Sequence, residues 1–497
     1  MTKNFSIPIS RRDFLKLAGL TAGAIFSGTT GEKKVSASSA AKNLNFSDVN
    51  LPTVCDADIC ICGGGSAGTA AAVSAARNGL KTVLIERGIV LGGQQTQGLV
   101  YPCMPTFAPA SDTPYISEVN ARMRKNGVEP TDPERTMPTS GGACYQPEIL
   151  ATIYDEICAE TGVEIFYNTN LIGAKVEEGK IISAVIQTIE GFAEVRAKIF
   201  VDATGDALLS RFSGVPVAKG SEKSGKNQPM SFRFEMGGVD EKKLYRYIVN
   251  RLDDEVGRES KLPYFEFVKS ETLTPFFEKG VASGELTSED IVYIQAMTIV
   301  GKPGTLSMNC PELPVRFGAT DFFSYSRAVS YGRVMMRRLA NFFVKNMPGF
   351  KKAYISREAS ILGVRESWRI FGKYYMTAED YFGKHRFPDA ICRTAYQIDI
   401  HDEKLDISRK LKKGDYYEIP YRALVTNEIE NLIVVGRCIS ANFAAQASVR
   451  IQPTCMSMGE AAGIAAAWSL QKKIPANLVE WDKIPPEKRS YINFAAN

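Results

Sequence analysis

The 497-residue chain has a net charge of +5, and 44% of its residues are hydrophobic. A chain of this length can bury a large core and is expected to form two or three folded units. Its ten scattered cysteines contain no C-x₂-C pair, and only two histidines are present. This usage excludes a disulfide framework and an iron–sulfur or histidine-rich metal centre, so we expect no metal site.

The first 37 residues contain six lysines and arginines but two acidic residues, so the rest of the chain is nearly neutral. A neutral chain carries no field that would attract nucleic acid, and no nucleic-acid partner is expected. The stretch SRRDFLK at residues 10–16 matches a twin-arginine export signal. The apolar run that follows is too short to span a bilayer, and small residues at 35–37 offer a cleavage site.

We therefore expect a twin-arginine signal peptide over residues 1–37 and a linker over 38–55. The alternative for this N-terminus is a basic amphipathic segment. The signal predicts export through the twin-arginine translocase to the periplasm or the cell exterior. This route carries folded proteins, which points to a cofactor that is loaded before export.

Residues 57–86 read as a buried strand, a glycine turn, an alanine-rich helix and a second strand. Gly63, Gly65 and Gly68 satisfy G-x-G-x-x-G between the first strand and the helix. The first glycine makes the turn, the second lets the backbone approach a pyrophosphate, and the third lets the helix pack on the strand. Glu86 ends the second strand, where a carboxylate can bind a ribose. The unit predicts a dinucleotide site.

Glu86 does not separate FAD from NAD, because both contain adenosine diphosphate, but later segments do. Gly92 and Gly93 in GIVLGGQQTQGLV allow another close backbone approach. The segments VDATGD at 201–206 and NLIVVGR at 431–437 each read as a buried strand followed by a turn. A helix with an alanine and glycine face opens after Pro453.

Together these blocks resemble the glutathione-reductase-type FAD fold and, more narrowly, the bacterial FAD-dependent oxidoreductases. The resemblance extends over roughly residues 55–470 and implies an α/β fold: a Rossmann-like, discontinuous FAD-binding domain with an inserted α+β substrate or cap domain. It also extends to the flavin part of heterodisulfide reductases, but their ferredoxin-type cysteine runs are absent here. The FAD site implied by the resemblance comprises Gly63, Gly65, Ser66, Ala67, Gly68, Glu86, Arg87, Gly92, Gly93, Gln94, Thr96, Leu171, Thr204, Gly205, Asp206, Gly436, Arg437, Pro453 and Thr454.

Residues 56–215 and 411–475 are expected to form the FAD-binding domain, with residues 216–410 inserted as the cap and 476–497 as a tail. The insert contains an alternating strand with Met230, Phe232, Phe234 and Met236 on one face. Two further strand-like runs follow at 290–300 and 302–315, and a long helix is predicted over 326–346.

His401, in YQIDIHD, is the stronger proton-transfer candidate of the two histidines, because it lies in a block that carries the resemblance. Arg365 and Arg369 are predicted one helical turn apart, either as a clamp for a carboxylate or phosphate or as a structural ion-pair lattice. Arg450 precedes the helix after Pro453, whose N-terminus would point at the flavin according to the resemblance. His385 is expected in a polar loop, and Cys103 is expected to be a buried thiol.

The sequence favours an exported FAD-dependent oxidoreductase that acts on a small organic substrate. No second G-x-G-x-x-G occurs in the insert, so a quinone, cytochrome or similar carrier is the expected electron partner. Arg365, His401 and Arg450 permit a reductase that acts on a carboxylate, and the direction of the reaction stays open. Two alternatives are an exported NAD-dependent glycosidase that oxidises its substrate transiently and a non-catalytic binding subunit.

Overall fold

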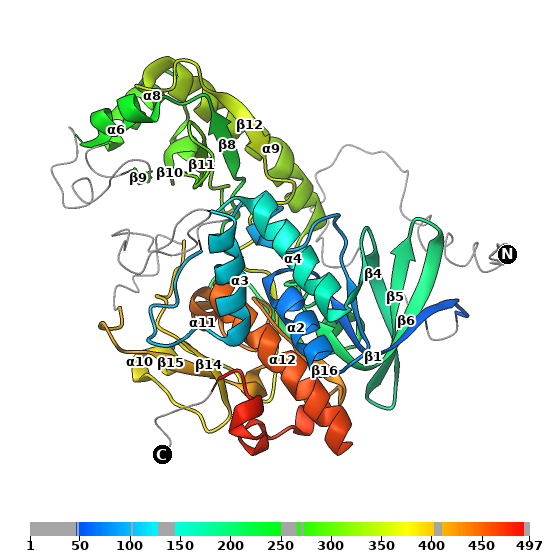
Figure 1. The fold of residues 1–497 in the computed structure, drawn as a ribbon. Helices are drawn as coiled ribbons and strands as arrows, with labels where there is room; N and C mark the ends of the chain where they lie inside the picture. Colours follow the sequence, from blue (N-terminus) through cyan, green and yellow to red (C-terminus); the bar gives the residue numbers. More distant parts are fainter. Residues whose placement is uncertain are drawn as a thin grey trace. The chain divides into compact units, whose positions relative to one another are not determined.

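The computed structural model describes residues 46, 49–100, 103–127, 145–249, 266–269, 273–401 and 410–491 (Figure 1). The predicted signal peptide and most of the predicted linker lie outside these residues, as does the end of the predicted tail. The segment Asn43–Asn497 forms one compact unit. The predicted domain boundaries within it stay predictions.

A central sheet contains the two strands that were predicted within residues 57–86. Its strand order is β3-β2-β1-β6-β5-β4, and β16 pairs with β6. The strands β1, β2, β3, β6 and β16 run parallel, whereas β4 and β5 continue from β6 as an antiparallel meander. This arrangement confirms the predicted α/β class. The bounds are β1 (Thr53–Cys62), β2 (Thr82–Ile85), β3 (Glu164–Phe166), β4 (Asn170–Glu177), β5 (Lys180–Thr188), β6 (Gly191–Asp202) and β16 (Leu432–Val434).

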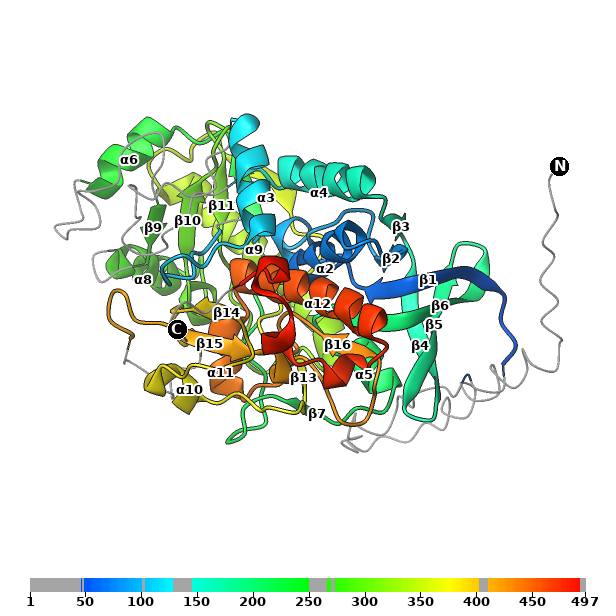
Figure 2. The same cartoon turned by 60° about the horizontal axis from the view of Figure 1, so that its bottom comes forward.

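A layer of helices lies beside this sheet: α2 (Ser66–Arg77), α3 (Pro114–Lys125), α4 (Pro147–Thr161) and α12 (Gln452–Lys472). Both ribbon views show α2 and α12 side by side (Figures 1 and 2). Glycines on α12 permit this approach, because a Cβ at Gly459 would collide with the carbonyl oxygen of Ala67. The Ser74 hydroxyl adds a 2.8 Å hydrogen bond to the carbonyl of Glu460. The predicted alanine and glycine face is therefore the contact between the two helices.

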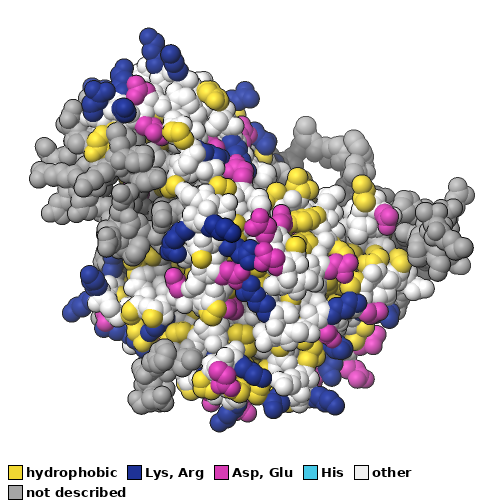
Figure 3. All heavy atoms as spheres, in the orientation of Figure 1, with side chains coloured by type: hydrophobic (Ala, Val, Ile, Leu, Met, Phe, Trp, Pro, Cys, Tyr) yellow, Lys and Arg dark blue, Asp and Glu magenta, His cyan; other side chains and the backbone are white. Residues whose placement is uncertain are grey.

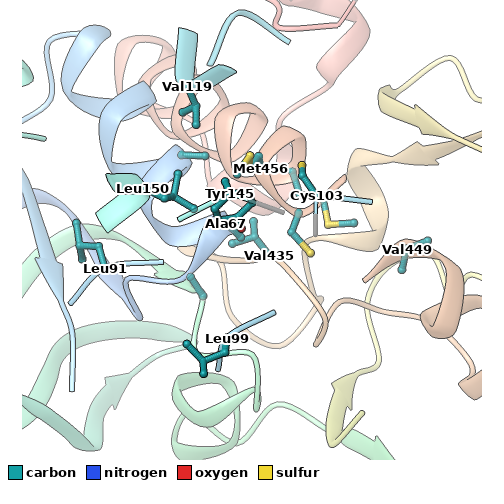
Figure 4. Packing of buried hydrophobic residues seen from close by; sticks show 14 of the residues in the cluster. Ala67, Leu91, Leu99, Cys103, Val119, Tyr145, Leu150, Val435, Val449 and Met456 are labelled. Atoms are coloured by element: carbon teal, nitrogen blue, oxygen red, sulfur yellow. The ribbon is translucent and has the colours of Figure 1, made fainter. Parts of the chain in front are cut away.

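The main core lies around this helix pair. Ala67 of α2, Met456 of α12 and Tyr145 belong to one cluster of buried residues (Figure 4). Tyr145 is 2% exposed and Ala67 6%. The loop that begins α2 is thus anchored in the most buried part of the protein.

Replacing Gly459 by valine is expected to destabilise the fold by about 3 kcal/mol, because the added side chain forces α12 away from α2. Urea or thermal unfolding measures the loss. Gln471→Ala, at an exposed position near the end of the same helix, is the matched control and should unfold like the wild type. Equal stability of the Gly459 variant and the wild type would contradict the close packing.

A second, antiparallel sheet has the order β12-β8-β11-β10-β9. Its strands are β8 (Phe234–Gly237), β9 (Glu266–Val268), β10 (Gln295–Thr298), β11 (Leu306–Met308) and β12 (Tyr354–Glu358). The helices α6 (Glu241–Val249), α8 (Thr274–Ala282) and α9 (Phe322–Asn346) accompany it (Figure 1). The predicted cap strands and the long helix are all present. The four predicted apolar positions from Met230 to Met236 are buried.

Smaller elements complete the described chain. The pairs β7 (Val217–Lys219) with β13 (Trp368–Ile370) and β14 (Ala390–Thr394) with β15 (Tyr417–Pro420) form two-stranded sheets. Short helices are α5 (Leu208–Phe212), α10 (Ala378–Gly383) and α11 (Phe443–Val449). No helix in the described part of the chain is both long enough and apolar enough to cross a bilayer.

The face drawn in Figure 3 carries basic and acidic side chains that alternate rather than gather by sign. On α3, for example, Glu118 pairs with Arg122 at 2.9 Å and with Arg77 of α2 at 2.7 Å. Such exposed pairs contribute little to stability. This face therefore presents mixed charge.

Candidate active site

The turn between β1 and α2 has the geometry that its three glycines predicted. Gly63 has a φ of +105°, and a Cβ there would lie 2.6 Å from the carbonyl oxygen of Ala203. A Cβ at Gly68 would collide with the carbonyl of Gly63. At Gly65, by contrast, a Cβ would meet no atom within 4 Å. The turn therefore closes against β6 and leaves the backbone of Gly65 open to the adjacent cavity.

The first turn of α2 is also open. Gly65 is its N-cap, and no side chain caps the helix there. The first backbone N–H groups of a helix have no partner within the helix, and together with the helix dipole they favour a bound anion. The open face at Gly65 and the uncapped helix end form a cradle for a pyrophosphate.

Glu86 is buried at the end of β2, and backbone groups hold its carboxylate in place. Gly64 donates to Oε2 at 2.8 Å and Gly88 donates to Oε1 at 2.7 Å. Each carboxylate oxygen can accept a further hydrogen bond. The side chain lines the cavity and can accept hydrogen bonds from a ribose.

The segments VDATGD and NLIVVGR meet at an ion pair. Arg437 Nη2 lies 2.7 Å from Asp206 Oδ1, which also accepts a 2.6 Å hydrogen bond from Ser367. Burial raises the pKa of Asp206, but the guanidinium of Arg437, the hydrogen bond from Ser367 and the charge of Arg87 together hold the pKa below its ordinary value. Gly205, at φ +73°, leaves room for this guanidinium.

Buried Gln95 and half-buried Gln452 link the start of α2 to the start of α12. Gln95 Oε1 accepts hydrogen bonds from Ser66 at 2.6 Å and from Tyr154 at 2.7 Å. Its amide donates to Gln452 Oε1 at 3.1 Å. Gln452 lines the cavity and was missed by the sequence analysis, which placed the helix opening at Pro453.

These features border one cavity of about 980 Å³. Most of the predicted cofactor residues line it: Gly63, Gly65, Ser66, Ala67, Glu86, Arg87, Gly93, Gln94, Leu171, Thr204, Gly205, Asp206, Gly436 and Arg437. The other five, Gly68, Gly92, Thr96, Pro453 and Thr454, do not line it. Gly92 instead donates to the carbonyl of Gly64 at 2.8 Å, and Thr96 donates to the carbonyl of Leu91 at 2.5 Å. These two residues shape the loop behind the cavity wall.

The three predicted catalytic residues lie in the same cavity and are joined through two carboxylates. Arg365 Nη2 lies 3.3 Å from Glu312 Oε2, and His401 Nδ1 lies 2.6 Å from the same oxygen. His401 Nε2 is 3.6 Å from Asp399 Oδ1, and Arg450 Nη2 is 2.8 Å from Asp399 Oδ2. We call Arg365, Glu312, His401, Asp399 and Arg450 the ion-pair chain. Basic and acidic side chains alternate along it.

The environment of the ion-pair chain keeps Asp399 ionised. Burial raises its pKa, but the neighbouring His401 and the charges of Arg450 and Arg365 hold it well below the ordinary value. The ring of Tyr293 meets that of His401 edge to face at 5.2 Å. Burial raises the pKa of Tyr293 to about 12, so the phenol keeps its proton at neutral pH.

The cap sheet supplies polar groups that the sequence analysis did not single out. Arg233 lines the cavity and donates from Nη2 to Ser307 at 2.8 Å. Gln295 Oε1 accepts hydrogen bonds from Asn309 at 2.7 Å and from Tyr293 at 3.0 Å. The sequence contains a pattern that could have identified Arg233, since the alternation SFRFEM places a charge between buried phenylalanines.

The prediction of a helix through Arg365 and Arg369 is wrong. Gly363 exchanges backbone hydrogen bonds with Ser231, and Trp368 begins a strand, so the chain is extended here. Arg369 is buried against Glu366 and donates to the carbonyl of Ala441 at 2.9 Å. The two arginines therefore form no clamp, and Arg369 belongs to a structural ion pair.

Two other candidates lie outside the cavity wall. His385 is half-exposed and places Nδ1 2.7 Å from Asp380. Cys103 is buried, which raises the pKa of its thiol to about 12 and keeps it protonated. In the described part of the chain, no group of three or more His, Cys, Asp or Glu residues is arranged to hold a metal ion.

Parallel strands, a glycine turn that opens on a cavity and an uncapped helix beside it define a dinucleotide-binding oxidoreductase fold. Residues 58–486 match the family model described as FAD dependent oxidoreductase. The chain belongs to this family, and it is a FAD-dependent enzyme. The residues present fit the cofactor, since Gly65 leaves the pyrophosphate position open and Glu86 stands at the ribose position.

The curated relatives match one part of the chain. Mitochondrial dihydrolipoyl dehydrogenase of Schizosaccharomyces pombe is 26% identical over 166 residues, which is 32% of this chain and 30% of the relative. Mercuric reductase of Streptomyces lividans is 28% identical over 152 residues, or 30% of each chain. The match thus spans about a third of the length of either relative. A geranylgeranyl bacteriochlorophyll reductase-like structure from Thermoplasma acidophilum covers 88% of this chain and 84% of its own, at 14% identity and a TM-score of 0.42.

Proposed function

We propose that this protein is an exported FAD-dependent oxidoreductase that acts on a small organic substrate beside the ion-pair chain. The observation that carries the proposal is one shared cavity. The pyrophosphate cradle at Gly65 and the side chains of Arg365, His401 and Arg450 all line it. A cofactor seated on the cradle and a substrate beside the ion-pair chain would therefore share one cavity.

Bound FAD supplies the hydride or electron-pair chemistry. The protein side chains would then orient the substrate and move a proton. His401 suits the proton transfer, because imidazole changes its charge near neutral pH. Glu312 and Asp399 flank its two ring nitrogens, so they hold the ring in position.

The electron partner proposed here is a quinone, a cytochrome or a similar carrier. The support is the sequence, since residues 216–410 contain no second G-x-G-x-x-G for a nicotinamide cofactor. Chemically reduced enzyme is mixed anaerobically with a soluble quinone, cytochrome c, NAD⁺ or NADP⁺, and the return of the oxidised-flavin band is followed. We expect rapid reoxidation by the quinone or cytochrome, whereas rapid reoxidation by a nicotinamide would overturn this part of the proposal.

Export rests on the twin-arginine stretch, which lies outside the described residues. If FAD must be bound before translocation, Gly65→Asp should reduce the exported fraction along with the activity. Cell fractionation and immunoblotting measure that fraction, and replacement of Arg11 and Arg12 by lysine provides the export-defective reference. Export of apo-protein at the wild-type yield would disprove the link between cofactor loading and export.

The family assignment argues against the two alternatives from the sequence. Transient oxidation by a glycosidase would use NAD, whereas the chain belongs to a FAD-dependent family over residues 58–486. The assignment also argues against a non-catalytic binding subunit, because the family is described as one of oxidoreductases. The substrate search therefore concerns redox reactions.

A further inference from the structure

The cavity wall is strongly basic. Among the described residues, eight lysine and arginine side chains line it, against three carboxylates. Two of the basic residues, Arg87 and Arg437, lie with Glu86 and Asp206 among the predicted cofactor residues. The remaining lining residues include a single carboxylate, Asp399. Six further basic residues line the cavity: Arg233, Arg365, Lys410, Lys412, Lys413 and Arg450.

The basic side chains of the cavity differ in exposure: Lys410, Lys412 and Lys413 are exposed, whereas the three arginines are not. An approaching ligand therefore meets exposed positive charge first and then buried or half-buried guanidiniums. Such an arrangement raises the local concentration of anions and their rate of entry. It disfavours a cationic substrate.

Arg450 keeps hydrogen-bonding capacity for a ligand. Its Nη2 donates to the carboxylate of Asp399 at 2.8 Å and to the backbone carbonyl of the same residue at 3.2 Å. Its Nη1 makes no hydrogen bond to any described residue, and its buried Nε has no described partner either. A guanidinium that is mostly buried and only partly paired is stabilised when a ligand supplies an acceptor.

The neighbouring groups set the charge of that ligand. Asp399 and Glu312 offset much of the positive charge of Arg450 and Arg365, so a single anionic group matches what the ion-pair chain leaves unpaired. Phe107 and Tyr396 line the same cavity with stacked rings, their centroids 6.2 Å apart. This wall suits an organic skeleton rather than an inorganic ion.

We propose that the substrate is an organic carboxylate whose carboxylate group binds to Arg450 Nη1. This inference rests on the proposed function, since it names the substrate class of the same site. The aromatic wall holds the carbon skeleton, and His401 lies beside it for proton transfer. The lysines at 410, 412 and 413 guide the anion inward.

The test uses FAD-loaded, purified protein and pairs of probes that differ in charge alone: propionate against propionamide, and benzoate against benzamide. Each is titrated while the visible spectrum of the bound flavin is recorded. We expect either acid to bind at least tenfold more tightly than its amide, and Arg450→Gln to remove that preference. Arg327→Gln, at an exposed position on α9, is the control and should keep it.

Equal affinity for acid and amide in the wild type would overturn the inference, as would tighter binding of inorganic phosphate than of either acid. If Arg450→Gln does not fold, Lys412→Ala tests the same idea: acid binding should weaken and lose part of its salt dependence, with amide binding unchanged. No change in acid binding would then count against the inference. Absence of the flavin band is a distinct result that would refute the proposed function instead.

Discussion

The Gly65→Asp variant should fold like the wild type and be purified without FAD. A Cβ at residue 65 meets no protein atom within 4 Å, and we expect the fold to tolerate the substitution. Its carboxylate would enter the space where the pyrophosphate binds. Two like charges about 4 Å apart at an effective dielectric constant of about 20 repel by about 4 kcal/mol, which is roughly a thousandfold in affinity. The ratio of flavin to protein absorption measures the loss.

Two further glycine variants distinguish the effect of an added charge on FAD binding from an effect on folding. Gly65→Asn has the same size without the charge and should retain more FAD than Gly65→Asp. Gly68→Ala should instead lower the unfolding temperature, because its Cβ collides with the carbonyl of Gly63. A stoichiometric complement of FAD in purified Gly65→Asp would contradict the assignment of the cradle.

His401→Asn should retain FAD and lose turnover by about 10²- to 10⁴-fold, the range that positioned proton-transfer groups contribute. The change leaves the residues that line the cofactor end of the cavity intact but removes the ring between Glu312 and Asp399. Anaerobic single-turnover kinetics, followed at the oxidised-flavin band, measure the step directly. The pH dependence of the wild-type rate should contain an ionisation that the variant lacks.

The matched control is His385→Asn, because this second histidine pairs with Asp380 away from the cavity wall. Its turnover should equal that of the wild type. Glu312→Gln should fall between the two, since Glu312 acts through His401 and Arg365 as a positioning residue. Wild-type turnover and pH profile in His401→Asn would exclude His401 from proton transfer.

The sequence predicted the glycine turn between β1 and α2 well because its signals are local. The turn at Gly63, Gly65 and Gly68 joins a strand directly to a helix, and each glycine has a steric role that its spacing reveals. Glu86 lies at the end of the next strand for the same reason. The role of Gln452 was less visible, since its partner Gln95 is distant in the chain.

The arrangement around the ion-pair chain was predicted in part. Arg365, His401 and Arg450 were chosen separately, and the structure places all three on one cavity wall. The carboxylates that join them were not predicted, because Glu312 comes from the loop after the cap strand β11 and no local pattern links it to His401. Ion pairs between distant segments depend on the tertiary fold.

The error at Arg365 and Arg369 has a related cause. The spacing of the two arginines fits a helix, but Gly363 pairs its backbone with Ser231 and the buried Glu366 accepts a hydrogen bond from Gly220 at 2.8 Å. These long-range hydrogen bonds hold the segment extended. Tertiary contacts thus override the helical spacing.

The most direct test of the central claim is the visible absorption of the purified protein under anaerobic conditions. The spectrum is recorded before and after addition of hydroxy acids, amino acids, alcohols and sugars, and organic acceptors are then added to the chemically reduced enzyme. We expect an oxidised-flavin band that one class of donor bleaches, or that one class of organic acceptor restores, in the wild type but not in His401→Asn. A band that no donor bleaches, in an enzyme whose reduced form no organic acceptor reoxidises, would contradict it.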